Sequence, residues 1–161
     1  MNKKGHVLNA ILLGIGLGYL LEPAGDADTF ATILEIGVPV TLGALVPDVD
    51  TAFGKHRKTL HNLPLLAGFV VFPYAFGNLE YVWIGVLTHY ALDVAGSKRG
   101  IALFYPFYSK EYGLPIGVPV GSSYADLLTV VITGLELALA GAIVYRLPRW
   151  GFELGRQALG L

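Results

Sequence analysis

All four histidines and three of the six aspartates in this sequence lie either between its apolar stretches or near an end of one. The chain has no cysteine, so thiolate chemistry is excluded and a metal site would have to use imidazole and carboxylate ligands. Such ligands suit zinc, manganese or iron. The seven candidate ligands are His6, Asp48, Asp50, His56, His61, His89 and Asp93.

The spacing of these residues favours a shared site. His89 and Asp93 are four residues apart, and on a helix this spacing presents both side chains on one face. Two of the aspartates follow Pro47, and two of the histidines lie in the polar stretch after it. Each feature has an ordinary alternative: a local hydrogen-bonded pair, a turn after a helix, or histidines that face lipid phosphates. Their occurrence together favours one or two metal ions, with any surplus residues orienting the ligands.

The elements that must position these residues are apolar. Hydrophobic residues make up 54% of the 161 and charged residues 14%, whereas soluble domains carry about 25% charged residues. A membrane-spanning helix needs about 20 residues, and a soluble chain of this length has too little polar surface to cover five apolar helices. We therefore expect a single all-α domain over residues 1–161, a polytopic membrane bundle with about five transmembrane or membrane-embedded helices. The apolar stretches are residues 7–21, 30–46, 63–76, 79–92 and 127–147.

Prolines and glycines mark the connections. Gly77 and Asn78 predict a tight hairpin between the third and fourth apolar stretches, and Pro39 and Pro73 predict kinks inside two of the helices. Residues 95–123 are rich in proline and glycine and predict a long loop, which in a compact domain is usually functional. The tail after Pro148 predicts either a short interfacial helix or a frayed end.

The basic residues predict the orientation of the bundle. With five spans, the N-terminus, residues 48–62 and residues 95–123 share one face, which receives eight of the eleven lysines and arginines. The positive-inside rule places this face in the cytoplasm of a cell whose inner or plasma membrane holds the chain. The same face receives all seven candidate ligands, which took no part in the charge argument. A net charge of −1 gives no basic field for nucleic acid, so membrane lipid is the expected partner.

The order of these motifs resembles the YdjM-like family of inner-membrane metal-dependent hydrolases. The resemblance covers about residues 5–116, and the residues that carry it are Gly5-His6, Pro47-Asp48-Val49-Asp50, His56-Arg57, His61, His89, Asp93, Phe104-Tyr105-Pro106 and Leu114-Pro115. The family is thought to be distantly similar to zinc-dependent phospholipase C and related single-strand nucleases. The resemblance therefore implies a membrane-bound phosphoesterase that acts on a lipid headgroup or an amphiphile, with zinc as the expected metal.

The resemblance also implies roles for single residues. Metal ions would lower the pKa of a bound water from about 16 to about 7, and Asp48 or Asp50 would accept its proton. Arg57 would hold a phosphate bidentately. The family usually has glycine, threonine and serine where Lys58, Leu60 and Asn62 stand, and it often has Thr-Pro where this chain has residues 96–99. The ligands are kept while their surroundings differ, so the metal is expected and the substrate stays open.

Two other classes of function fit the same residues. Glu35 and Glu136 lie inside apolar stretches, as a metal-transport path would require. The ligands gather at one face rather than at mid-membrane, which argues against transport. A non-catalytic membrane protein with a structural metal site is the remaining alternative.

Overall fold

The computed structural model describes residues 3–119 and 121–159, and within these ranges the regular structure is entirely helical. The expected all-α membrane bundle is confirmed. The elements are α1 (Lys3–Leu21), α2 (Ala27–Leu45), the 3-10 helix η1 (Pro47–Thr51), α3 (Leu63–Phe76), α4 (Val82–Ala95), α5 (Ala125–Val144) and α6 (Leu147–Ala158).

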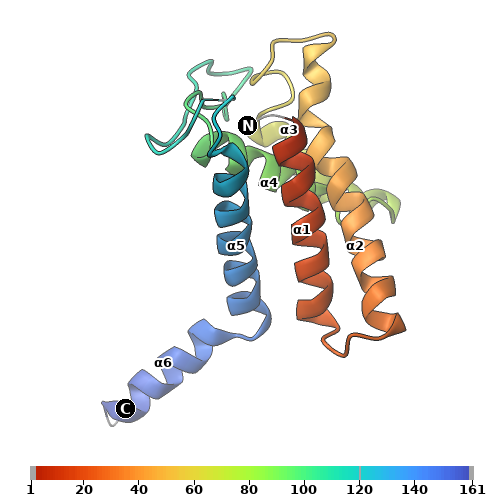
Figure 1. Ribbon diagram of the computed structural model, residues 1–161, viewed down its shortest axis with the longest axis vertical. Coiled ribbons are helices and arrows are strands. Elements are labelled where there is room, and N and C mark those ends of the chain that lie inside the picture. Colours follow the sequence, from red (N-terminus) through yellow and green to blue (C-terminus); the bar gives the residue numbers. More distant parts are fainter. Residues whose placement is uncertain (1–2, 120, 160–161) are drawn as a thin grey trace.

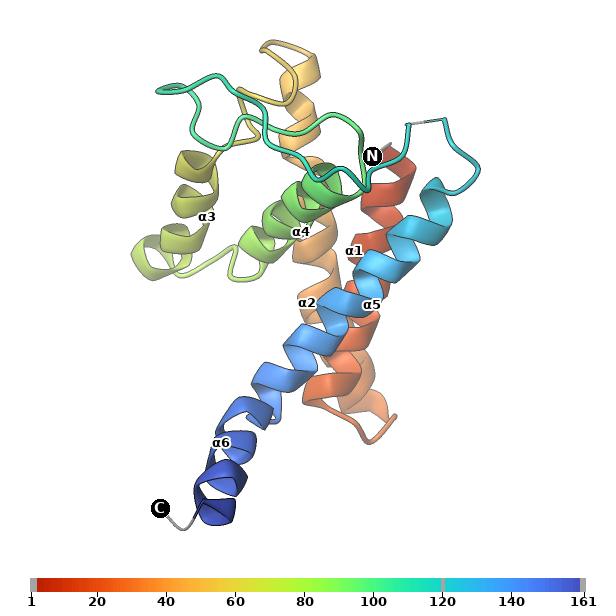
Figure 2. The same cartoon turned by 90° about the vertical axis from the view of Figure 1, so that its left-hand side faces the viewer.

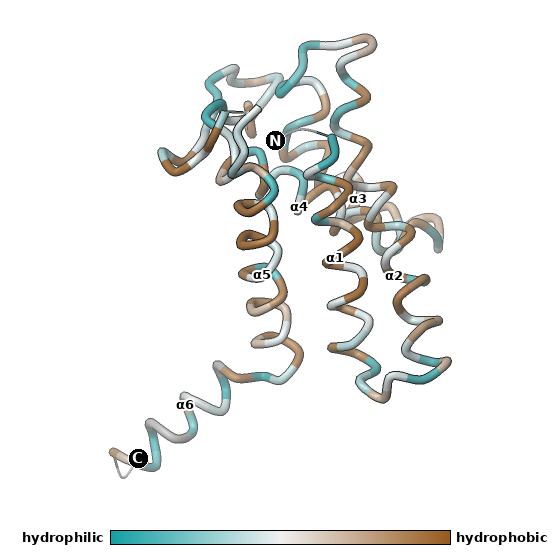
Figure 3. Tube along the Cα trace, viewed as in Figure 1, coloured by the Kyte–Doolittle hydropathy of each residue, from teal (hydrophilic) through white to brown (hydrophobic). Residues whose placement is uncertain are grey.

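Three of these helices are long and apolar enough to cross a membrane: α1, α2 together with η1, and α5. A helix of about 20 residues is about 30 Å long, which matches the hydrocarbon core of a bilayer. Figure 1 and Figure 2 show α1 and α5 descending from the same end of the bundle while α2 returns to it. The most hydrophobic positions follow these helices, and polar positions gather at the loops (Figure 3).

Glycines bring the helices close together. A Cβ atom on Gly14 of α1 would lie 2.6 Å from the Cα of Gly37 on α2, so these two backbones are in direct contact. Where α4 crosses α2, a Cβ on Gly43 or Gly85 would collide with the backbone of the other helix. Small residues allow such close approach between membrane helices. The crossing places His89 of α4 against the last turn of α2.

The third and fourth apolar stretches form a short hairpin rather than two spans. The helices α3 and α4 have 14 residues each, which is about 21 Å and too short to cross. The Asn62 side chain caps the start of α3 by accepting from the Leu65 N–H (2.9 Å). Gly77, in the left-handed conformation (φ 67°), ends it. Because the hairpin returns to the face it left, the expected grouping of the polar connections is unchanged (Figure 2). Pro39 and Pro73 both lie inside continuous helices.

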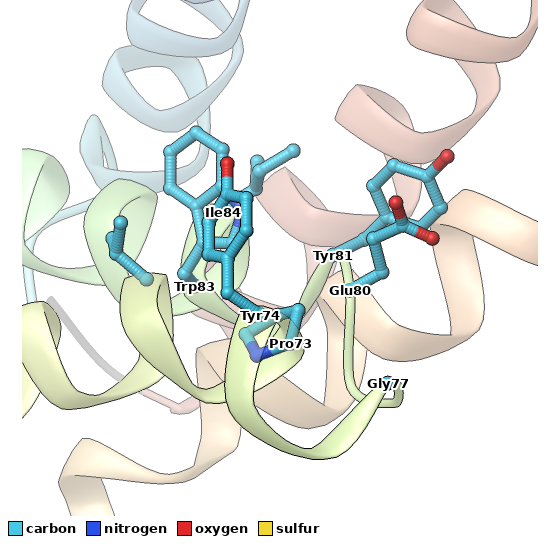
Figure 4. A pocket seen from close by; sticks show the side chains of 8 residues that line it. Pro73, Tyr74, Gly77, Glu80, Tyr81, Trp83 and Ile84 are labelled. Carbon is cyan, nitrogen blue, oxygen red and sulfur yellow. The ribbon is translucent and has the colours of Figure 1, made fainter.

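A cavity of about 410 Å³ opens in the fork of this hairpin (Figure 4). Its lining includes Tyr74, Tyr81 and Trp83 and is mostly apolar. None of the seven candidate ligands lines it, and it lies near the start of α4, whereas His89 and Asp93 lie near the end of that helix. The cavity is therefore separate from the candidate site.

The long connection after α4 packs on the connection before α3. The Ala102 N–H donates to the Arg57 carbonyl oxygen (2.9 Å), and the Leu63 N–H donates to the Leu103 carbonyl oxygen (2.8 Å). Arg99 and Glu111 pair through two side-chain hydrogen bonds of 2.9 and 2.8 Å. The expected long loop between the last two apolar stretches is thus an ordered cap over one end of the bundle.

Candidate metal centre

All seven predicted ligand residues converge at the end of the bundle where α1 begins and where α2 and α4 end. His6 comes from the first turns of α1, two aspartates come from η1, and two histidines come from the loop after it. The helix α4 contributes the pair predicted from the sequence, with His89 Nε2 3.8 Å from Asp93 Oδ2. Two sets of three have ligand atoms within 4.8 Å of one another: His6, His89 and Asp93, and Asp48, His56 and His61.

His61 and His89 meet at the centre of the site, where their Nε2 atoms are 3.1 Å apart. The Nδ1 atom of His89 lies 2.7 Å from the carbonyl oxygen of Ala44, and that of His61 lies 3.0 Å from Asp50 Oδ2. A ring nitrogen that faces an oxygen acceptor carries the proton, so in a neutral ring the Nε2 atom presents a lone pair. Two lone pairs therefore point at one place.

A cation bound between the two Nε2 atoms would remove the repulsion between their lone pairs. Burial lowers the pKa of His61 below its ordinary value, and the Asp50 carboxylate opposes that shift only in part, so its ring is neutral at pH 7. Ligand atoms that share a tetrahedral ion with bonds of about 2.0–2.1 Å lie about 3.3 Å apart. The separations from the Asp93 carboxylate to His6 Nε2 and to His61 Nε2 are 3.5 and 3.7 Å. The donor set and its spacing fit a divalent metal ion.

The His6 imidazole is buried within the candidate site. Its side chain is 1% exposed, and neither ring nitrogen has a hydrogen-bond partner within the described residues. The ring stacks on His89, with centroids 3.6 Å apart and planes 8° apart. Its Nε2 atom lies 3.5 Å from Asp93 Oδ1, so this buried imidazole and carboxylate are placed where they could share a metal ion.

Asp50 lies behind two of the imidazoles. Its Oδ1 atom is 3.0 Å from His56 Nδ1, and its Oδ2 atom is 3.0 Å from His61 Nδ1. The Leu60 N–H also donates to Oδ2 (3.3 Å). The sequence placed Asp50 among the ligands, but a carboxylate with both oxygens on imidazoles has the geometry of a group that fixes the orientation of its neighbours.

Arg57 is buried beside the site rather than at its opening. Its Nη1 donates to Ser97 Oγ (3.0 Å), to the Gly100 carbonyl oxygen (3.3 Å) and to the Arg99 carbonyl oxygen. Its Nη2 lies 3.7 Å from Asp93 Oδ1. A bidentate hold on a phosphate, expected from the sequence, would require the guanidinium to leave these carbonyl groups. In this geometry Arg57 anchors the loop and places a positive charge beside Asp93.

Two groups that the sequence did not single out also position the site. The Tyr90 hydroxyl accepts from the Asn62 N–H (3.0 Å) and donates to the Leu60 carbonyl oxygen (2.7 Å), so it holds both neighbours of His61. The second group is the carbonyl of Ala44. Tyr90 follows a predicted ligand directly, which is the only sequence signal it has, and a backbone carbonyl has none.

Among the described residues, the exposed part of the site is formed by His56 and Asp48. The side chains of His6, His61, His89 and Asp93 are at most 2% exposed. Those of His56 and Asp48 are 41% and 12% exposed. A molecule from outside therefore reaches the centre past His56 and Asp48.

The two carboxylates considered for transport lie away from this centre. Glu35 is on the exposed side of α2. Glu136 of α5 accepts a hydrogen bond from Asn9 Nδ2 (2.6 Å) between α1 and α5. Neither residue belongs to the two ligand sets.

The fold and the site together define a helical membrane protein with a histidine and aspartate cluster at one end of its bundle. Residues 1–152 match the family described as YdjM inner membrane protein, and the chain belongs to that family. The resemblance stated from the motifs is thereby confirmed. No curated protein and no solved structure matches the chain.

Proposed function

We propose that this protein is a membrane-bound metal-dependent hydrolase that acts on a phosphoester, either a lipid headgroup or another amphiphile. The observation that carries the proposal is the pair of Nε2 atoms of His61 and His89, 3.1 Å apart, each in a ring whose Nδ1 faces an oxygen acceptor. An imidazole held through its other nitrogen is the usual arrangement of a metal ligand.

The residues present suit zinc, with manganese or iron as the alternatives, because the donors are imidazoles and carboxylates without sulfur. His6, His89 and Asp93 would hold one ion, and Asp48, His56 and His61 would hold a second or complete the first. Bound there, the metal supplies a hydroxide at neutral pH and polarises the phosphoryl oxygen.

Asp48 is the better of the two candidates for the proton acceptor. Its side chain lies at the opening, 3.9 Å from His89 Nε2 and 4.0 Å from His56 Nδ1, and it is partly exposed. Asp50 is fully buried and occupied by two imidazoles. A base must reach both the attacking water and the solvent that carries its proton away, and only Asp48 meets both requirements.

Exposed aromatic side chains in the connections at this end of the bundle support an amphiphilic substrate. Phe53 follows η1 and is 67% exposed, and Phe107 and Tyr108 in the long loop are 87% and 54% exposed. Lys58 lies beside this loop and donates to the Ser109 carbonyl oxygen (3.2 Å). Exposed aromatic rings with a neighbouring lysine suit the boundary between lipid chains and headgroups. A lipid in the adjacent leaflet would present its phosphate at this level.

Metal analysis and a hydrolysis assay test the proposal. The full chain, purified in detergent, is expected to contain zinc, manganese or iron and to cleave bis-p-nitrophenyl phosphate, with activity lost to a chelator and restored by the metal. His89→Ala should lose both metal and activity. Asp126→Asn, which removes a surface pair with Lys4, is the matched control.

The assay separates the proposed function from its rivals. Metal without hydrolysis of this probe or of phospholipid vesicles would reduce the site to a structural one. Metal flux into liposomes without hydrolysis would favour a transporter. Activity that survives both the chelator and His89→Ala would overturn the proposal.

A further inference from the structure

The C-terminal helix α6 leaves the bundle at the end opposite the metal centre (Figure 1, Figure 2). It follows the span α5 after two residues, of which Arg146 has a left-handed conformation (φ 53°). The exposed fractions of Leu147, Trp150 and Phe152 are 50%, 62% and 68%. An aromatic and aliphatic surface of this kind has no cover from the rest of the described chain.

The side chains of α6 are sorted by face. At 100° per residue, Leu147, Trp150, Gly151 and Ala158 share one side of the helix. Arg149, Glu153 and Arg156 occupy the other side at spacings of four and three residues, and Phe152 lies at the edge of that side, next to Arg156. This separation is the signature of a helix that lies at a boundary between an apolar and a polar phase.

The position of α6 identifies that boundary. The preceding helix α5 is a candidate membrane span that ends at Val144, so α6 begins where the bilayer ends. Its 12 residues make a helix of about 18 Å, too short to cross, and its charged side cannot enter hydrocarbon. We propose that α6 lies in the membrane surface opposite the metal centre, with Trp150 among the lipid chains and its arginines on anionic phospholipid headgroups.

Charge favours anionic lipid over neutral lipid. Arg149 pairs with Glu153 at 3.1 Å, which neutralises one arginine. Arg146 and Arg156 then give the segment an excess of positive charge, and arginine binds phosphate in a planar, bidentate manner. These are the three basic residues that lie away from the predicted cytoplasmic face, and lipid binding gives them a role there.

The chain offers a direct test because Trp83 and Trp150 are its two tryptophans. In the Trp83→Phe variant of the full chain, reconstituted in vesicles, Trp150 is the sole indole. Lipids brominated near the headgroup should quench its emission roughly twofold or more over lipids brominated near the chain ends, and the emission should be blue-shifted. Water-like emission without quenching would overturn the proposal. A blue-shifted emission that no brominated lipid quenches would indicate contact with a second copy, and would also overturn it.

A second variant tests the anionic preference. In vesicles that mix phosphatidylglycerol and phosphatidylcholine, quenching by brominated phosphatidylglycerol should exceed that by brominated phosphatidylcholine. Adding Arg146→Gln and Arg156→Gln to Trp83→Phe leaves the paired Arg149 and Glu153, and should abolish this difference while the blue shift remains. Equal quenching by both lipids before the arginine changes would refute the anionic preference. The changed residues lie outside the candidate metal centre, so metal content and hydrolysis should be unaffected and this test is independent of the proposed function.

Discussion

His6 and Asn9 lie three residues apart on α1, both fully buried, but they belong to polar groups of different kinds. Asn9 Nδ2 donates to Thr133 Oγ1 (2.9 Å) and to Glu136 Oε2 (2.6 Å) on α5. The Thr133 hydroxyl in turn donates to the Thr129 carbonyl oxygen (2.8 Å). In this cluster each donor meets an acceptor on the neighbouring helix or turn, while two acceptor atoms, Asn9 Oδ1 and Glu136 Oε1, are buried without a hydrogen-bond partner among the described residues.

The candidate metal centre differs because its acceptors converge. The Nε2 atoms of His61 and His89 face each other with carboxylate oxygens nearby. The Nδ1 atom of each ring contacts an oxygen acceptor on its other side. A divalent cation would satisfy such an arrangement. The comparison teaches that burial of polar groups alone does not mark a functional site. The arrangement of donors and acceptors distinguishes a site that could bind an ion from a hydrogen-bonded contact that joins two helices.

The largest effect is expected from removing a ligand. His61→Ala and His89→Ala each delete a nitrogen from the centre, and their loss of metal affinity should exceed the roughly 10–100-fold that follows loss of an orienting partner. Metal titration followed by dialysis and elemental analysis measures this loss. Unchanged metal content in both variants would place the metal elsewhere, and the contrast between the two regions would disappear.

Asp50→Asn should have a smaller effect on the same measurement. An amide in place of the carboxylate cannot accept from both imidazoles, so their orientation is lost while the ligand atoms remain. We expect about a 10–100-fold loss of metal affinity. A loss as large as that of His61→Ala would instead make Asp50 a ligand.

The pH dependence of the metal-free protein should reflect the lowered pKa of His61. Between this lowered value and about 6.5, the unfolded chain binds a proton that the folded chain does not. Stability therefore falls as the pH decreases through that window. Thermal unfolding of chelator-treated protein should show a decrease that His61→Gln reduces. An increase in stability toward low pH in that window would contradict the neutral imidazole.

The smallest effect on the metal is expected from the Asn9 cluster. Glu136→Leu leaves the buried Asn9 amide without one acceptor, which should cost about 1–3 kcal/mol of stability. Glu136→Gln keeps an acceptor and should cost less. Both variants should retain their metal, as shown by elemental analysis beside denaturation in detergent. Loss of metal in Glu136→Gln would mean that the two regions act as one.

The sequence alone predicts much of the candidate site because its signals are local or depend on chain direction. The spacing of His89 and Asp93 places both on one side of α4 wherever that helix lies. The face that receives His6 and residues 47–62 follows from the number of times the chain crosses or returns, and a hairpin that re-emerges gives the same result as two spans. The absence of cysteine limits the range of metals that the site could bind, and the apolar composition predicts a membrane protein.

Only the tertiary structure decides the roles inside the site. Helix crossing brings the Ala44 carbonyl to His89, 45 residues apart in sequence, and the Arg57 guanidinium to a loop some 40 residues away. Counting apolar stretches overestimated the number of membrane-spanning helices, because helices of 14 residues can pack on a bundle without crossing the membrane. Composition and chain direction predict where each segment ends relative to the membrane. They therefore predict which residues gather at one membrane face. Hydrogen bonds between distant segments, which exist only after packing, decide which of those residues can bind a metal and which hold the others in place.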